Sequence, residues 1–173
     1  PPDAVRRLVQ EAHERYQAND DGEVSQVYPA LARASRRLFG VAVVGATGNV
    51  YSAGDARHEF TIMSVSKPFV FALVCQELGP GVVRERLGVN ATGLAFNSFE
   101  AVERSADGRT NPMVNSGAIA ATSLVPGDGP EERWRFIRDG LSRFAGRRLE
   151  RTDVVRHRRG ERRAAGRRSR PGG

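Results

Sequence analysis

Ser64 and Lys67 stand three residues apart in the stretch FTIMSVSKPFVFALVC (residues 60–75), and both residue types take part in acyl transfer. Lys67 is the only lysine among the 27 lysine and arginine residues of the chain. A serine hydroxyl is a weak nucleophile at neutral pH and needs a base within hydrogen-bonding reach. A lysine can act as that base when desolvation favours its neutral form, whereas arginine stays protonated in proteins. The pair therefore predicts a serine nucleophile activated by a lysine.

A helix must position this pair. The pattern predicts a helix over residues 66–78, with Pro68 in its first turn, where proline is tolerated, and Gly79 at its end. Side chains three apart at a helix start lie on one face. The helix dipole and the unpaired N–H groups would stabilise an alkoxide and an oxyanion there. A surface lysine beside a helix-capping serine is the alternative interpretation, and Ser66 is a competing nucleophile that points elsewhere on the helix.

Other segments show the periodicity of secondary structure. Residues 3–18 and 127–146 are amphipathic and predict two helices. Their expected buried stripes are Val5, Leu8, Val9, Ala12 and Tyr16 in the first, and Trp134, Ile137, Leu141 and Phe144 in the second. Residues 40–55 (GVAVVGATGNVYSAGD) contain two short β-rich runs around a Gly/Thr/Asn turn, which predicts a hairpin. Shorter helices are expected over residues 82–88 and from about residue 116.

The net charge of +7 is concentrated at one end of the chain. Residues 151–173 carry nine arginines against Asp153 and Glu161, whereas residues 1–150 carry 18 basic and 18 acidic side chains. Beyond Val155 the segment has no apolar residue larger than alanine, so we expect it to be disordered. A basic tail can bind nucleic acid. The abrupt change of composition instead favours translation of a GC-rich gene out of frame.

Composition also bounds the class of protein. No stretch approaches the roughly 20 apolar residues of a membrane span, and residues 1–16 lack a signal-peptide core. We therefore expect a soluble, cytoplasmic protein without a membrane partner. Cys75 is the only cysteine, so an internal disulfide is excluded. His13, His58 and His157 have no partners at ligand spacing, and we expect neither a metal nor another cofactor.

Five segments resemble, in order and spacing, the serine-dependent glutaminases, which hydrolyse the side-chain amide of L-glutamine to glutamate and ammonia. They are VYPALA, GVAVVGATGNVYSAGD, FTIMSVSKPF, TGLAFNS and NPMVNSGAI. The resemblance as a whole extends over most of residues 1–150. The resemblance implies an α+β, β-lactamase/transpeptidase-like fold, in which helices surround an antiparallel sheet and the nucleophile begins a buried helix. It also implies a homo-oligomer for the intact protein, because family members commonly form dimers or tetramers.

The same resemblance implies roles for individual residues. Ser64 matches the nucleophile, with its backbone N–H as an oxyanion donor, and Lys67 matches the residue that takes the serine proton. Asn115, in NPMVNSGAI, matches a substrate-binding asparagine, although its sequence context alone suits a helix N-cap. Tyr28, in VYPALA, matches a tyrosine at the substrate pocket, with a half-buried core tyrosine as the alternative. Met63 stands where many members have glutamine, so substrate affinity or preference could differ.

The resemblance fades near LERTDVV, and the second half of the family's catalytic domain has no match in this chain. We interpret residues 1–150 as the N-terminal part of a glutaminase catalytic domain, and residues 151–173 as a disordered or frameshifted tail. The missing strands would leave exposed sheet edges, and an open, wet site would make Lys67 a poor base. The sequence therefore predicts little or no activity for this chain by itself.

Two other functions remain open. A penicillin-recognising acyl-transfer enzyme uses the same Ser-x-x-Lys device, but it carries a later Lys-Thr-Gly strand, and this chain has no second lysine. A non-catalytic domain whose arginine tail binds nucleic acid would show steep salt dependence that disappears when residues 151–173 are removed.

Overall fold

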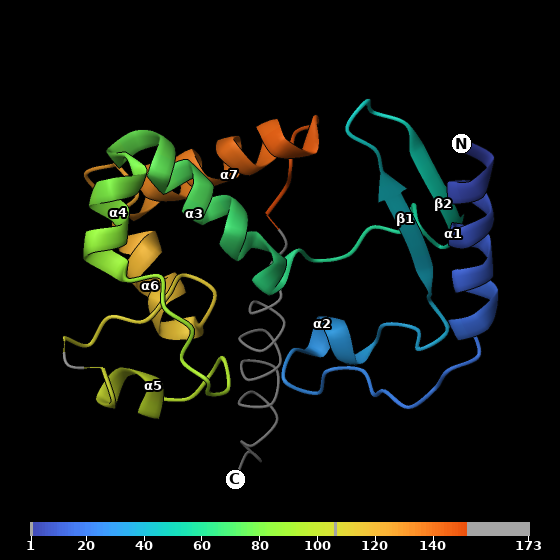
Figure 1. Ribbon diagram of the computed structural model, residues 1–173, viewed down its shortest axis with the longest axis horizontal. Coiled ribbons are helices and arrows are strands. Elements are labelled where there is room, and N and C mark those ends of the chain that lie inside the picture. The colour runs from blue at the N-terminus through green and yellow to red at the C-terminus, as the bar shows by residue number, and fades with distance from the viewer. Residues whose placement is uncertain (1, 106, 152–173) are drawn as a thin grey trace, which may run out of the picture. The chain divides into compact units, whose positions relative to one another are not determined.

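The computed structural model describes residues 2–105 and 107–151, which fall into two compact units (Figure 1). The first unit covers residues 2–60 and the second covers residues 61–151. The arginine-rich segment that follows lies outside the described residues, so its disorder stays a prediction.

The first unit is a β-hairpin with a helix packed against it. It contains helix α1 (Pro2–Tyr16), the single-turn helix α2 (Pro29–Ala32), strand β1 (Gly40–Val44) and strand β2 (Val50–Gly54). The strands are antiparallel, with Val44 opposite Val50 at the turn. The turn is closed by a hydrogen bond from Gly45 N to Asn49 O at 2.9 Å, and Gly48 takes a φ of 84° that glycine adopts without strain. The predicted hairpin is confirmed.

Helix α1 confirms the first predicted helix, but its buried stripe is narrower than predicted. Val9 is buried, whereas Leu8 and Tyr16 are 63% and 50% exposed. A sheet of two strands offers a narrow surface, so it covers only one row of the side chains on α1. His13 on this row stacks on Phe39, with ring centroids 5.5 Å apart.

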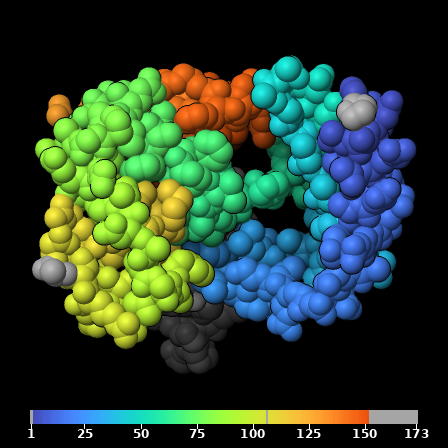
Figure 2. Space-filling model, in the orientation of Figure 1, coloured from blue at the N-terminus to red at the C-terminus, as the bar shows by residue number. Residues whose placement is uncertain are grey.

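The second unit is built around one helix, α3, which packs against α4, α6 and α7. Its elements are the 3-10 turn η1 (Met63–Val65), α3 (Ser66–Leu78), α4 (Pro80–Leu87), the single turn α5 (Glu100–Glu103), α6 (Asn115–Ser123) and α7 (Pro130–Ala145). Figure 2 shows green atoms of α3 beside the orange atoms of α7. The core residues are Val70, Val74, Val83, Leu87, Ala121, Val125, Ile137 and Leu141. Helix α7 approaches α3 closely at Gly140, where a Cβ would lie 2.3 Å from Leu73 Cδ1.

The predicted stripe of α7 is only half buried. Ile137 and Leu141 are buried as predicted, whereas Trp134 and Phe144 are 38% and 54% exposed. Phe144 still contacts Phe69 of α3, with ring centroids 5.1 Å apart. Helical periodicity identifies the apolar face of α7, but it does not say how far along α7 the partner helix reaches.

The helix predicted over residues 66–78 is confirmed at both ends. Pro68 lies in its first turn, and Gly79 ends it with a φ of 83°. Helices α4 and α6 confirm the two shorter predicted helices, whereas α2 and α5 were not predicted. The described part of the chain is α+β, as expected, with a small antiparallel sheet in the first unit and several helices in the second.

Candidate active site

The start of α3 places the Ser-x-x-Lys pair. Ser64 lies in η1, the turn that leads into α3, and Lys67 is the second residue of α3. The Ser66 hydroxyl donates a hydrogen bond to the Met63 carbonyl oxygen at 2.7 Å, so it is engaged within the turn. The Ser64 side chain is exposed, and its hydroxyl has no hydrogen-bond partner among the described residues. Of the two serines, Ser64 is therefore the one with an available hydroxyl.

The turn before Ser64 is strained. Met63 is the one non-glycine residue with a positive φ, 43°, in the described part of the chain. The left-handed conformation costs roughly 1–2 kcal/mol for a residue with a Cβ. Such strain clusters at functional sites, where the surrounding structure holds it in place. The strain falls one residue before the predicted nucleophile, and nothing in the sequence signalled it.

A turn built by Asn111 sets the start of α6. The Asn111 Oδ1 accepts a hydrogen bond from Met113 N at 2.9 Å, and its Nδ2 donates to Asn90 O at 2.8 Å. Gly117 allows α6 to approach this turn, because a Cβ there would lie 1.9 Å from the Asn111 carbonyl oxygen. These contacts make Asn115 the first residue of α6.

Lys67 and Asn115 are joined directly. The Lys67 Nζ donates to Asn115 Oδ1 at 2.7 Å and to the Met113 carbonyl oxygen at 3.0 Å. It also lies 5.5 Å from the centroid of the Phe96 ring, and the Asn115 backbone N–H donates to the Phe96 carbonyl at 2.8 Å. The interpretation of Asn115 as an N-cap is wrong, because Val114 occupies that position and the Asn115 side chain binds Lys67.

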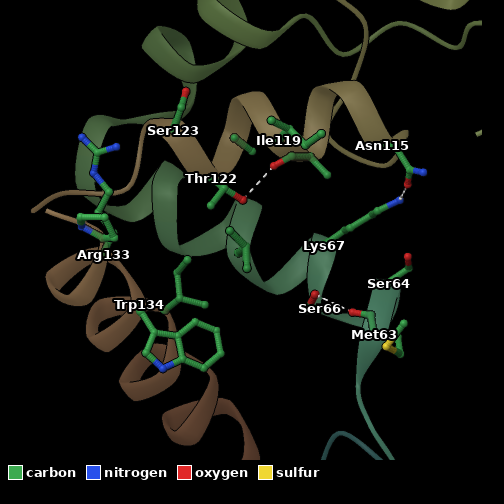
Figure 3. Close-up of a pocket in the computed structure, with 15 residues that line it drawn as sticks. Met63, Ser64, Ser66, Lys67, Asn115, Ile119, Thr122, Ser123, Arg133 and Trp134 are labelled. Carbon is green, nitrogen blue, oxygen red and sulfur yellow. Dashed lines mark hydrogen bonds between the residues drawn. The ribbon is translucent and has the colours of Figure 1, made fainter. Parts of the chain in front are cut away.

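Ser64, Lys67 and Asn115 line one end of a cavity of about 770 Å³ between α3, α6 and α7 (Figure 3). The opposite end carries side chains from the end of α6 and the start of α7, namely Ser123, Arg133 and Trp134. Trp134 was predicted as a core residue and instead lines this cavity. The apolar periodicity of α7 could have identified Trp134 as inward-facing, but no signal in the sequence marked Arg133.

Tyr28 belongs to the other unit. It is the residue before α2, where its carbonyl oxygen accepts hydrogen bonds from Leu31 N at 2.9 Å and Ala32 N at 3.0 Å. Its side chain is half-buried. Its predicted role at the substrate pocket stays a prediction.

Three side chains outside the cavity have pKa values shifted from their usual range. Hydrogen bonds from the Arg109 side chain and backbone, and one from Ser105, hold the pKa of Asp107 well below its usual range, and the same pairing raises the pKa of Arg109. Burial raises the pKa of the Cys75 thiol on α3.

In the described part of the chain, no three His, Cys, Asp or Glu side chains gather as a metal site would need. No helix among the described residues has the length and apolar character to cross a membrane.

Comparison with known proteins identifies relatives of this chain. A sequence model of the glutaminase family matches residues 22–168. Glutaminase 2 of Yersinia pestis is 62% identical over 154 residues, which are 89% of this chain and 45% of that protein. The glutaminase of Mycobacterium ulcerans (strain Agy99) is 42% identical over 151 residues, or 87% of this chain and 47% of that protein. The chain thus spans about half the length of the curated relatives it matches.

Solved structures agree with this assignment. The structure of the probable glutaminase ybaS superposes with a TM-score of 0.85 at 35% identity, and the match covers 90% of this chain and 50% of that one. The structure of Mglu in its tris and glutamate form superposes with a TM-score of 0.75 at 33% identity, covering 84% and 33% of the two chains. The fold is therefore part of the β-lactamase/transpeptidase-like fold that the sequence predicted. Since the family model matches well over half of its residues, this chain belongs to the glutaminase family.

Proposed function

We propose that this chain is the nucleophile-bearing part of an enzyme that hydrolyses L-glutamine to L-glutamate and ammonia. The observation that carries the proposal is the 2.7 Å hydrogen bond between Lys67 Nζ and Asn115 Oδ1, in a cavity that Ser64 also lines. It links the proposed base to the proposed substrate-binding amide. Membership in the glutaminase family supports this substrate and argues against a penicillin-recognising enzyme.

In the first half-reaction, Ser64 Oγ attacks the side-chain amide carbon of glutamine, and Lys67 Nζ takes the serine proton. The amide oxygen becomes an oxyanion, and the backbone N–H of Ser64 donates a hydrogen bond to it. The oxyanion then collapses, the C–N bond breaks, and Lys67 returns the proton to the departing ammonia. The product is a γ-glutamyl ester on Ser64.

In the second half-reaction, a water molecule loses a proton to Lys67 and attacks the ester carbon. The bond between that carbon and Ser64 Oγ then breaks, Lys67 returns the proton to Ser64 Oγ, and glutamate is released. Asn115 supplies binding: its Oδ1 accepts from Lys67, so its Nδ2 is the group that donates to the substrate α-carboxylate. Met63 has a thioether where an amide is common, and a thioether accepts only weak hydrogen bonds, so we expect substrate affinity or preference to differ from that of other members.

The activity of this chain by itself is proposed to be weak. We propose that residues 1–150 are the N-terminal part of the catalytic domain, and a site formed by that part alone would stay open to water. We further propose that the intact protein is a cytoplasmic homo-oligomer without a metal or cofactor, and that residues 151–173 play no part in catalysis.

An activated substrate tests the nucleophile without demanding full turnover. The γ-p-nitrophenyl ester of L-glutamate has a leaving group that needs no proton, so Ser64 should become acylated even in a weak site. Mass spectrometry of a digest should place the glutamyl group on the peptide containing Ser64, and Ser64→Ala should abolish it. Ser123→Ala is the matched control, since Ser123 lines the same cavity, and it should acylate normally. An adduct on Ser66, or no adduct at all, would overturn the proposal.

A further inference from the structure

The Met113 carbonyl oxygen is one of the two oxygens that hold Lys67 Nζ, and it belongs to the backbone rather than to a side chain. A backbone acceptor faces the lysine only when its peptide unit is turned the right way. The Met113 side chain is 42% exposed, so its own packing does not fix that peptide unit. Another contact must turn the Met113 carbonyl toward Nζ.

The Asn111 side chain holds the other side of this peptide unit. Asn111 Oδ1 accepts a hydrogen bond from Val114 N at 3.3 Å, in addition to the one from Met113 N at 2.9 Å. The Val114 N–H and the Met113 C=O belong to one peptide unit, and in a trans peptide they point in opposite directions. An acceptor on the N–H side therefore leaves the carbonyl directed away from Asn111, where Lys67 Nζ lies 3.0 Å from it.

Asn111 is itself held in one orientation. Its Nδ2 donates to Asn90 O at 2.8 Å, in the loop that follows α4. Rotation of the amide by half a turn would set Nδ2 against the N–H groups of residues 113 and 114, and a donor does not bond to a donor. Pro112 is buried and lacks an N–H, so the first N–H groups after Asn111 are those of the next two residues. The side chain thus fits this turn in a single way.

We propose that Asn111 is a positioning residue for the proposed base: it orients the Met113 carbonyl, which in turn holds Lys67 Nζ in place. The inference rests on the proposed function, because Asn111 takes its role through that base. Asn111 is not among the described residues that line the cavity, so it acts through the Met113 peptide unit and not by touching substrate. Loss of its acceptor frees this peptide unit to rotate, and Nζ is then left with Asn115 Oδ1 as its hydrogen-bond acceptor.

The single lysine of the chain gives a readout that does not require turnover. Lysine labelled with carbon-13 at Cε gives one NMR signal, and its relaxation reports how freely the Lys67 side chain moves on the picosecond-to-nanosecond timescale. In the native chain Nζ is bound to two oxygens, so the Cε group should be rigid. Asn111→Ala removes the acceptor that fixes the peptide unit. The order parameter of Lys67 Cε should then fall toward the flexible range, below about 0.6.

Asn111→Ser is the conservative variant. A serine hydroxyl accepts from the N–H two residues on, as asparagine does but more weakly, and its shorter side chain loses the bond to Asn90 O. The alanine and serine variants therefore share the loss of the Asn90 bond and differ in the acceptor for the Met113 and Val114 N–H groups. The serine variant should hold Lys67 more rigidly than the alanine variant does. Equal mobility of Lys67 in these two variants, or in the native and alanine chains, would overturn the proposal.

Ser142→Ala is the matched control for a general loss of stability. Ser142 Oγ accepts from Leu149 N at 3.0 Å and donates to the Arg138 carbonyl at 2.7 Å, so its removal also leaves a backbone N–H without its acceptor. Urea unfolding should show a loss of stability, while the Lys67 signal should match that of the native chain. If this variant mobilises Lys67 as much as Asn111→Ala does, the effect is a general loosening and the proposal fails. If Asn111→Ala does not fold, Asn111→Ser decides, and a Lys67 signal like the native one would refute the proposal.

Acylation by the γ-p-nitrophenyl ester of L-glutamate separates this inference from the proposed function. Asn111→Ala should slow the acylation of Ser64 by about tenfold to about a hundredfold, because a misplaced base is a poor base. Asn111→Ser should slow it less, and Ser142→Ala should leave it close to the native rate. A native chain without a Ser64 adduct defeats the proposed function, whereas a Lys67 signal that only the Asn111 variants loosen still supports the positioning contact. Normal acylation of Asn111→Ala with a mobile Lys67 supports the function and overturns the role of Asn111.

Discussion

Replacing Gly117 with alanine tests the contact that positions Asn115. The added Cβ would lie 1.9 Å from the Asn111 carbonyl oxygen and 3.0 Å from Thr110 Oγ1, so the Asn111 backbone must retreat by about 1 Å. Overpacking against backbone costs about 3 kcal/mol, and a broken Asn111 hydrogen bond costs about 1 kcal/mol more. The better helix propensity of alanine returns about 1 kcal/mol. The free energy of unfolding should therefore fall by about 3 kcal/mol.

Urea unfolding followed by the fluorescence of Trp134 measures this loss, because the only tryptophan lies in the same unit as Gly117. Gly81→Ala is the control. Gly81 lies in α4, and a Cβ there would have no neighbour within 4 Å. It should leave the free energy of unfolding unchanged or raise it by up to about 1 kcal/mol. Equal stabilities of the two variants would refute the packing argument.

Three further predictions concern other parts of the second unit. Leu73→Ala should lower the free energy of unfolding by about 2–5 kcal/mol in the same urea assay, because Leu73 is 2% exposed; a loss below about 1 kcal/mol would contradict its core role. Because burial raises the pKa of Cys75, iodoacetamide should alkylate the native chain more slowly than the urea-unfolded chain at mildly alkaline pH. Because hydrogen bonds from Arg109 lower the pKa of Asp107, its stabilising contribution is present above the ordinary aspartate range and is lost only as pH falls through the lowered pKa. Carbon-13 NMR should find Asp107 ionised at about pH 3, and Arg109→Gln should move its titration back toward about 3.9.

Local signals predicted the helices and the hairpin well, because their ends depend on single residues. Pro68 marks the start of α3 and Gly79 marks its end, and Gly48 supplies the left-handed conformation of the hairpin turn. The same patterns overestimated burial at Trp134 and Phe144. Periodicity reports which face of a helix is apolar, whereas burial depends on the neighbouring element, which periodicity does not describe.

The candidate site shows the same division between local and distant information. The Ser-x-x-Lys spacing predicted Ser64 and Lys67 because the two residues are close in sequence: Ser64 lies in the turn η1, and Lys67 lies in the first turn of α3 that follows it. Asn115 is 48 residues from Lys67, so its position against Nζ depends on the fold of α6 onto α3. Only a resemblance to known sequences could suggest its role. The Asn111 turn and the positive φ of Met63 left no recognisable trace in the sequence.

The choice of lysine at position 67 follows from the bonds that its nitrogen makes. A neutral lysine amine has two N–H groups and one lone pair, and two oxygens flank Nζ: the Met113 carbonyl at 3.0 Å and Asn115 Oδ1 at 2.7 Å. If both N–H groups bond to these oxygens, the lone pair is left for the Ser64 proton. An arginine would satisfy the same oxygens, but a guanidinium does not give up its proton in proteins. The proposed chemistry thus requires lysine at the one position where this chain has it.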